Sequence, residues 1–224
     1  MRRFRQRALA AIAVAILGIL AAAGVVLIEG YVTAPAALRR AARYPLPLKV
    51  EDLKPDRQRV LLRVQDPNFY SHPGVDFSAS GSGWTTITQG LVKQLYFDHF
   101  RPGLLHLGKV RQSLLAIGFN ARVPKDEQLR LFLNRVYLGE LAGHSVYGFD
   151  EASHAYYGKP FADLSREEYV SLVATIVSPA TLNPASHRAD NLDRVARIER
   201  LLKGECTSLG KGDVFYAGCA RSTT

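Results

Sequence analysis

Cysteine, methionine and tryptophan are scarce in this chain of 224 residues, which has two cysteines, one methionine and one tryptophan. Both cysteines, Cys206 and Cys219, lie near the C-terminus, and no pattern of cysteine and histidine resembles a zinc site. In an exported chain, an oxidising compartment would favour a disulfide that closes a small loop between them. The alternative is a pair of unreacted thiols, and the spacing does not decide between the two.

Acidic side chains are outnumbered, since 29 Lys and Arg residues face 20 Asp and Glu residues and leave a formal net charge of +9. Four of these positive charges are arginines among the first seven residues, where no acid occurs. The excess indicates polyanionic neighbours such as phosphates or anionic lipid. No nucleic-acid-binding module is recognisable, so we expect no nucleic-acid partner. With 47% apolar and 22% charged residues, the composition excludes a wholly disordered chain.

A long apolar run without any charged side chain extends from Ala8 to Ile28. At about 1.5 Å of rise per residue, a helix of this length spans a bilayer core of roughly 30 Å. Arginines precede the run and Glu29 follows it, which by the positive-inside rule predicts a cytoplasmic N-terminus and an exported remainder. The alternative is a signal peptide cleaved near Ala21 to Ala23. We favour an uncleaved anchor, because the apolar region of a signal peptide is usually about 7–15 residues long.

Composition divides the chain into five segments. They are a basic cytoplasmic tail (1–7), a transmembrane anchor (8–28), a linker beside the membrane that is rich in Ala, Arg and Pro (29–48), a folded domain (49–205) and a C-terminal tail (206–224).

Helical periodicity runs through nearly all of the predicted domain. Pro55 and Pro124 each stand where a helix can begin, and Ser165 and Glu168 have the spacing of a capping box. No run of alternating residues predicts a strand, so we expect a mainly α fold. The apolar stripes that predict buried helix faces are Val60, Leu61 and Val64; Ile87, Leu91 and Leu95; Val110, Leu114 and Ile117; Leu129, Phe132, Leu133 and Val136; Leu172, Val173 and Ile176; and Leu192, Val195, Ile198 and Leu202.

Two loops, residues 65–77 and 79–88, concentrate Gly, Ser, Pro, His and aromatic side chains. Long loops of this composition are often functional. The alternative is a pair of surface Ω-loops, and composition alone does not distinguish them.

Five short motifs follow one another through these loops and helices. They are Gln65, Asp66, Phe69, His72 and Gly74; the run Gly83 to Gln94; Gly108, Lys109 and Gln112; Phe132-Leu133-Asn134 with Tyr137-Leu138-Gly139; and Tyr147-Gly148 with Ala155 to Lys159 and Leu182-Asn183-Pro184. In this order and spacing, over about residues 50–205, they resemble the peptidoglycan glycosyltransferase family (glycosyltransferase family 51), the transglycosylase domain of penicillin-binding proteins and its monofunctional relatives. The resemblance implies a lysozyme-like helical domain after one N-terminal transmembrane helix, with its cleft beside the membrane.

In that family the 4-hydroxyl of an acceptor sugar attacks the anomeric carbon of a lipid-linked glycan, and undecaprenyl pyrophosphate leaves. The hydroxyl needs a base, which is the family's first glutamate, and the leaving pyrophosphate needs cationic and hydrogen-bonding groups. A divalent metal sometimes assists the leaving group. We therefore expect Mg²⁺ or Mn²⁺ only if the chain is active, and we predict no metal ligands and no other cofactor.

Glutamine stands at both positions where the family has a catalytic glutamate, Gln65 in the first motif and Gln112 in the third. An amide keeps the shape of the acid but accepts no proton. Loss of a general base typically costs about 10²- to 10⁴-fold in rate, or about 3–5 kcal/mol of barrier. Asp66 is adjacent, but if Gln65 ends a helix its side chain projects about 100° away, and no acid occurs between His99 and Lys125. We expect turnover to be impaired or absent.

Other family positions have also changed: Gly90 replaces a glutamine, Gly108 replaces an arginine and Arg130 replaces a glutamate. Arg111 lies close enough to Gly108 along a helix to face the same way. What the resemblance retains is the binding half of the site; the alternative for its cations is a solvated helix face. The candidate substrate-binding residues are Asp66, Phe69, His72, Thr85, Thr86, Gln89, Lys93, Lys109, Arg111 and Asn134.

Our leading hypothesis is a transglycosylase-like protein anchored by a single span in a bacterial inner (cytoplasmic) membrane, with its domain periplasmic or extracellular. It would bind lipid-linked cell-wall precursor, a glycan strand or a partner synthase with little or no turnover. The alternative is an active polymerase of lipid II that uses an atypical base. Glycan cleavage needs a carboxylic acid near the scissile bond, and both family acids are replaced. A scaffold with an empty cleft would tolerate substitution of Lys93 and Lys109.

Overall fold

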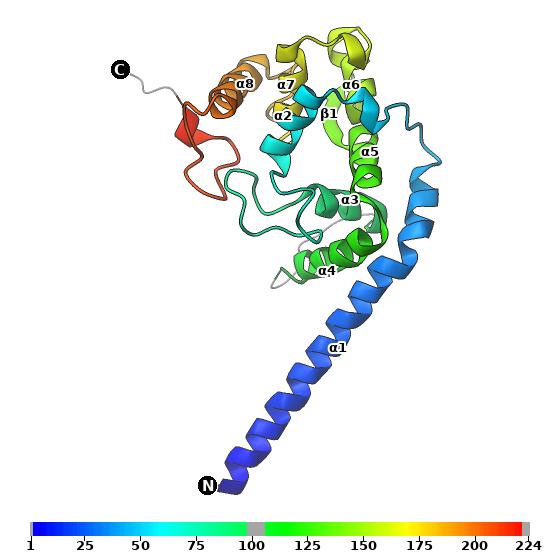
Figure 1. The fold of residues 1–224 in the computed structure, drawn as a ribbon, viewed down its shortest axis with the longest axis vertical. Helices are drawn as coiled ribbons and strands as arrows, with labels where there is room; N and C mark the ends of the chain where they lie inside the picture. Colours follow the sequence, from blue (N-terminus) through cyan, green and yellow to red (C-terminus); the bar gives the residue numbers. More distant parts are fainter. Residues whose placement is uncertain (1, 98–105, 221–224) are drawn as a thin grey trace.

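The computed structural model describes residues 2–97 and 106–220 of the chain; Met1 and the last four residues of the predicted C-terminal tail lie outside this part. A helical domain stands at one end of the long helix α1 (Figure 1). In chain order the elements are α1 (Arg2–Ala41), η1 (Val50–Asp52), α2 (Pro55–Gln65), α3 (Ile87–Tyr96), α4 (Leu107–Arg122), α5 (Lys125–Arg135), β1 (Tyr137–Leu141), β2 (His144–Tyr147), α6 (Gly148–Tyr157), η3 (Phe161–Asp163), α7 (Arg166–Thr175), α8 (Arg188–Leu202) and η4 (Ala217–Cys219). The predicted mainly α class is confirmed.

Local signals in the sequence account for the ends of several helices. Pro55 is the first residue of α2, and Ser165 and Glu168 form the predicted capping box of α7. The stripes predicted on α2 and α5 are buried and belong to the main hydrophobic core. These elements form where they do because capping and apolar periodicity agree.

Helix α1 continues through most of the segment that the sequence analysis assigned to a linker. It runs unbroken to Ala41, so only about residues 42–48 connect it to the domain. The reason is packing: Ala34, Ala37 and Ala41 are buried, and Ala34 contacts the cluster formed by α3 and α4. Alanine favours a helix strongly, and the packed face outweighs the single Pro35. By length and composition, α1 is apolar enough to cross a membrane.

Two glycines let α4 approach α1 closely. A Cβ added at Gly118 would overlap the carbonyl oxygen of Leu27, and one added at Gly30 would overlap that of Leu115. The two helices therefore touch backbone to backbone at the end of the long apolar run. This contact fixes the position of α4, which carries three of the predicted site residues, relative to α1.

Gly118→Ala is expected to destabilise the protein by about 1–3 kcal/mol, because the added methyl group forces two backbones apart. Thermal unfolding of the full chain in detergent measures the effect. Gly24→Ala, in α1 with no atom near the added Cβ, is the matched control and should leave the melting temperature the same or higher. An unchanged melting temperature for Gly118→Ala would show that this contact does not hold the two helices.

The buried face predicted for α4 is wrong. Val110 is exposed and its stripe partners Leu114 and Ile117 are only half-buried, whereas the core side contains Leu115 and Phe119. Apolar side chains occupy most of the circumference of α4, so periodicity did not determine which face turns inward. The contacts with α1 and α3 decide it.

A short antiparallel hairpin, β1 with β2, also departs from the prediction of no strands. Its strands have five and four residues, too few for alternation to be visible in the sequence. The turn uses Ala142 and Gly143, both with positive φ. The hairpin carries Tyr137 and Tyr147 to one border of the cleft described below.

Candidate functional site

A cleft of about 570 Å³ lies between the end of α2, the loop that precedes α3, and the hairpin. Of the candidate catalytic and substrate-binding residues, Gln65, Thr85, Thr86 and Lys93 line it. Its other lining residues are Ser82, Gly83, Trp84, Ile87, Gly90, Leu91, Gln94, Phe132, Val136, Tyr137, Tyr147, Ile176, Val177, Pro179 and Val214. None of the described residues that line the cleft carries a carboxylate.

Gln65 is the last residue of α2, and its side chain is half-buried at the cleft. Its Nε2 donates a hydrogen bond to the carbonyl oxygen of Val173 in α7, 3.2 Å away. This bond orients the amide and leaves Oε1 as its acceptor atom. The resemblance assigns this position to the family base, and an amide here cannot take up a proton.

Asp66 is turned into the protein and ties the two functional loops together. It is 2% exposed and accepts hydrogen bonds from Nε2 of His72 at 2.9 Å and from the backbone N–H of Ile87 at 2.9 Å. Because Nδ1 of His72 accepts the N–H of Gly74, the ring proton lies on Nε2 and points at Asp66. Both side chains have positioning roles here: they join the end of α2 to the start of α3.

Thr85 and two lysines make a cationic, hydrogen-bonding corner. The Lys109 amine donates to the Thr85 hydroxyl at 2.9 Å, and Lys93 is exposed in the lining of the cleft. Burial lowers the pKa of Lys109, and the neighbouring positive charge of Lys93 lowers it further. Two positive charges beside a hydroxyl are a combination of groups that can bind an anion.

Thr86 and Gln89 form the capping box of α3 and are both buried. The Thr86 hydroxyl accepts the N–H of Gln89, and the Gln89 side chain accepts the N–H of Thr86. The Gln89 amide also donates to Ser113 on α4 at 2.9 Å. The family-like pattern at these positions therefore builds the start of α3, which presents Thr85 and Lys93.

Gln112 lies outside the lining of the cleft and is fully buried between α4 and α3. Its Nε2 donates to the backbone oxygen of Gln89 at 2.7 Å, while its Oε1 has no hydrogen-bond partner among the described residues. Arg111 does not turn toward the site either: it pairs with Glu29 of α1 at 2.8 Å. These two residues connect α4 to its neighbours.

Phe69 is a core residue, and the lysine that covers it was missed by the sequence analysis. The Lys125 amine lies 4.6 Å from the centre of the Phe69 ring and has no hydrogen-bond partner among the described residues. Burial lowers the pKa of Lys125 to about 8, and the charge of Asp66 acts in the opposite direction. Its position at the start of α5 gave no signal in the sequence, since a lysine there is ordinarily solvated.

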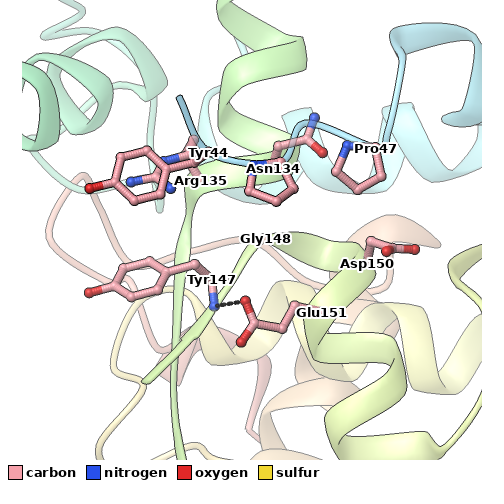
Figure 2. Close-up of a pocket in the computed structure, with 9 residues that line it drawn as sticks. Tyr44, Pro47, Asn134, Arg135, Tyr147, Gly148, Asp150 and Glu151 are labelled. Atoms are coloured by element: carbon pink, nitrogen blue, oxygen red, sulfur yellow. Dashed lines mark hydrogen bonds between the residues drawn. The ribbon is translucent and has the colours of Figure 1, made fainter. Parts of the chain in front are cut away.

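Asn134 borders a second cavity, of about 570 Å³, beside the hairpin (Figure 2). Its side chain is engaged by the backbone of Leu48, which it binds through both Oδ1 and Nδ2. Glu151 faces the same cavity and accepts the N–H of Tyr147 at 3.2 Å. Asn134 thus attaches the chain that leaves α1 to α5, and the Glu151 carboxylate lies outside the cleft lining.

The donor set of the cleft does not fit a metal held by the protein. Mg²⁺ and Mn²⁺ prefer carboxylate and other oxygen ligands. No group of three or more His, Cys, Asp or Glu side chains occurs together among the described residues, and the cleft lining offers amides, hydroxyls and a lysine.

The described residues thus combine a helical domain and a polar, lysine-bearing cleft with one helix that is apolar enough to cross a membrane. The family model described as Transglycosylase matches residues 33–203, and the chain belongs to this family.

Known relatives carry the domain as a small part of larger proteins. The chain is 30% identical to penicillin-binding protein 1F of Bacillus subtilis (strain 168) over 161 residues, 66% of this chain and 22% of that protein. It is 32% identical to penicillin-binding protein 1A of Pseudomonas aeruginosa over 171 residues, 70% of this chain and 20% of that protein. For penicillin-binding protein 1B of Escherichia coli (strain K12) the identity is 31% over 156 residues, 64% and 18% of the two chains. The chain spans about a fifth of the length of these relatives.

Proposed function

We propose that this chain binds a lipid-linked peptidoglycan precursor, or the glycan made from it, and does not polymerise it at an ordinary rate. The observation that carries the proposal is the composition of the cleft: hydroxyls and a lysine are present, an amide stands at the position of the family base, and no described lining residue has a carboxylate. The described lining of the cleft thus keeps groups that can bind a ligand and has no carboxylate that could accept a proton from it.

The binding role is assigned to the corner of Thr85, Lys93 and Lys109. A pyrophosphate carries several acceptor oxygens, and ionic hydrogen bonds to such oxygens are about twice as strong as neutral ones. The Thr85–Lys109 bond preorganises two of these donors. Gln65 lines the same cleft beside α7. Its amide can form a hydrogen bond with a sugar hydroxyl but cannot remove the proton of that hydroxyl.

We assign α1 the role of an inner-membrane anchor with its arginine-rich start in the cytoplasm. Its apolar part ends at Ile28, and the backbone contact of Gly118 with Leu27 places α4 at that end. The corner that contains Lys109 therefore lies close to the membrane surface, where the pyrophosphate of an inserted lipid would be found.

Lys93→Ala is expected to weaken binding of lipid II by about tenfold or more, because a charged hydrogen bond is worth about 1.5–3 kcal/mol. Equilibrium binding of lipid II to the purified full chain in detergent measures it. Lys203→Ala, an exposed lysine at the end of α8, is the matched control and should bind like the wild type. Equal binding by Lys93→Ala and wild type, or no binding by the wild type, would contradict the proposed function.

A further inference from the structure

The C-terminal segment folds back onto the domain instead of trailing from it as a tail. Cys206 and Cys219 form a disulfide, and Cys219 is buried in the main core. Tyr216 is 1% exposed, and its hydroxyl donates to the carbonyl oxygen of Val64, the residue before Gln65. Arg194 of α8 donates to the carbonyl oxygen of Ala174 in α7 and to that of Val214, and so attaches the segment to both helices. The family match ends at residue 203, so this structure lies beyond it.

This disulfide-closed segment, residues 206–219, holds the loop that forms one wall of the cleft. The backbone N–H groups of Gly81 and Gly83 donate to the carbonyl oxygens of Gly210 and Lys211, each at 3.0 Å. The Lys211 amine donates to the Ala79 carbonyl at 3.1 Å. The loop thus has the segment as a bonded partner on three of its backbone groups.

Glycine is required where the loop before α3 meets the disulfide-closed segment. Gly81 and Gly83 have φ values of +77° and +75°. A Cβ at Gly81 would lie 2.7 Å from the Tyr216 ring, and one at Gly83 would lie 2.9 Å from Val214. Positive φ and close approach both favour glycine. The loop conformation and the segment therefore fit each other closely.

Trp84, the single tryptophan of the chain, is presented at the cleft by this arrangement. Its side chain is 62% exposed, although leaving apolar surface in contact with water costs free energy relative to burying it. The Lys211 amine lies 5.5 Å from the centre of the Trp84 ring, and Val214 lines the same cleft. A rigid, exposed aromatic face braced by a cation suits a flat ligand that presents C–H groups, which a hexose ring does.

We propose that Trp84, Lys211 and Val214 form a saccharide subsite at the open side of the cleft, and that the disulfide-closed segment creates it by holding the loop in place. The ligand class is an amino-sugar ring of the lipid-linked glycan, stacked on the indole. The proposal rests on the proposed function, since it divides the ligand between this subsite and the cationic corner at Thr85. Lys93 and Lys109 bind the pyrophosphate; Trp84 binds the sugar.

The test compares two probes, lipid II and undecaprenyl pyrophosphate, each titrated into the purified full chain in detergent. They share the lipid and the pyrophosphate and differ in the disaccharide with its stem peptide. Trp84→Ala should weaken lipid II binding by about five- to tenfold and change undecaprenyl pyrophosphate binding by less than about twofold. Lys211→Ala should follow the same pattern more weakly. Lys93→Ala should weaken the binding of both probes. Trp84→Tyr, which keeps an aromatic face, should bind lipid II nearly as the wild type does.

Phe77→Ala is the matched control, because Phe77 is an exposed aromatic residue of the preceding loop that does not line the cleft. The wild-type fluorescence of Trp84 should shift with lipid II and stay unchanged with undecaprenyl pyrophosphate. Unaltered lipid II binding by Trp84→Ala, or equal losses for both probes, would overturn the subsite while leaving the proposed function intact. Failure of the wild type to bind either probe would overturn both.

Discussion

Gln65→Glu is expected to raise lipid II polymerisation by about 10²-fold over the wild type, at the low end of what a general base contributes. The low end applies because the family's arginine and glutamate of the third motif are Gly108 and Gln112 here. A glutamate at 65 would face the carbonyl of Val173, to which the amide now donates. An acceptor opposite a carboxylate disfavours its charged form, so its pKa should rise toward neutrality, as suits a general base.

The rate of this variant should therefore increase with pH through the raised pKa, since the ionised carboxylate is the active form. Glycan chains resolved by gel electrophoresis are the readout. Gln58→Glu, the same change on α2 outside the cleft lining, is the matched control and should stay as inactive as the wild type. A Gln65→Glu protein that binds lipid II normally and produces no glycan would show that the cleft has lost more than its base.

Gln112→Glu is expected to destabilise the folded protein by about 3 kcal/mol at neutral pH, because it places a carboxylate in a fully buried position against the Gln89 carbonyl. The hydrogen bond to that carbonyl, now 2.7 Å long, would become a repulsion unless the acid is protonated. The substitution that restores the family residue would thus harm this chain, since α3 and α4 now pack around an amide.

The loss of folding stability caused by Gln112→Glu should depend on pH. Burial raises the folded-state pKa of a glutamate at 112 above its unfolded value of about 4.3. The loss of stability should be absent below the unfolded pKa and grow as pH rises toward the folded-state pKa. Melting temperatures of variant and wild type between mildly acidic and neutral pH measure the difference. A difference in melting temperature that does not depend on pH, or no difference at all, would contradict the full burial of position 112.

Local rules predicted the helices that have both a clear end signal and one-sided apolar periodicity. Pro55 and the Ser165–Glu168 box start helices, and Leu129, Phe132, Leu133 and Val136 all face the core. The predictions failed where a tertiary contact decides. Residues 29–41 extend α1 because the buried alanines pack, and α4 turns Leu115 inward because α1 and α3 lie on that side.

The site was predictable only as far as the motifs reach. Gln65, Thr85 and Lys93 could be placed together because family spacing implies a shared cleft, and the structure brings them to one. Spacing does not say which motif residues face the cleft and which support it. Asp66, Gln89 and Asn134 have their hydrogen bonds turned inward, toward caps and backbone.

Val214 shows the complementary limit. It reaches the cleft from a segment that follows the family match, and a contact across so much intervening chain leaves no local signature. The sequence left open whether Cys206 and Cys219 pair, and the fold brings them together.

The most direct test of the central claim follows lipid II in a single sample of the purified wild-type chain in detergent, with a divalent metal added. Bound lipid II and polymerised glycan are both quantified. The account predicts that lipid II binds saturably and that glycan strands form no faster than in a sample of lipid II without protein. Glycan strands made by the wild type at a rate comparable to that of Gln65→Glu would contradict it, since a cleft with no carboxylate among its described lining residues would then be carrying out the transfer.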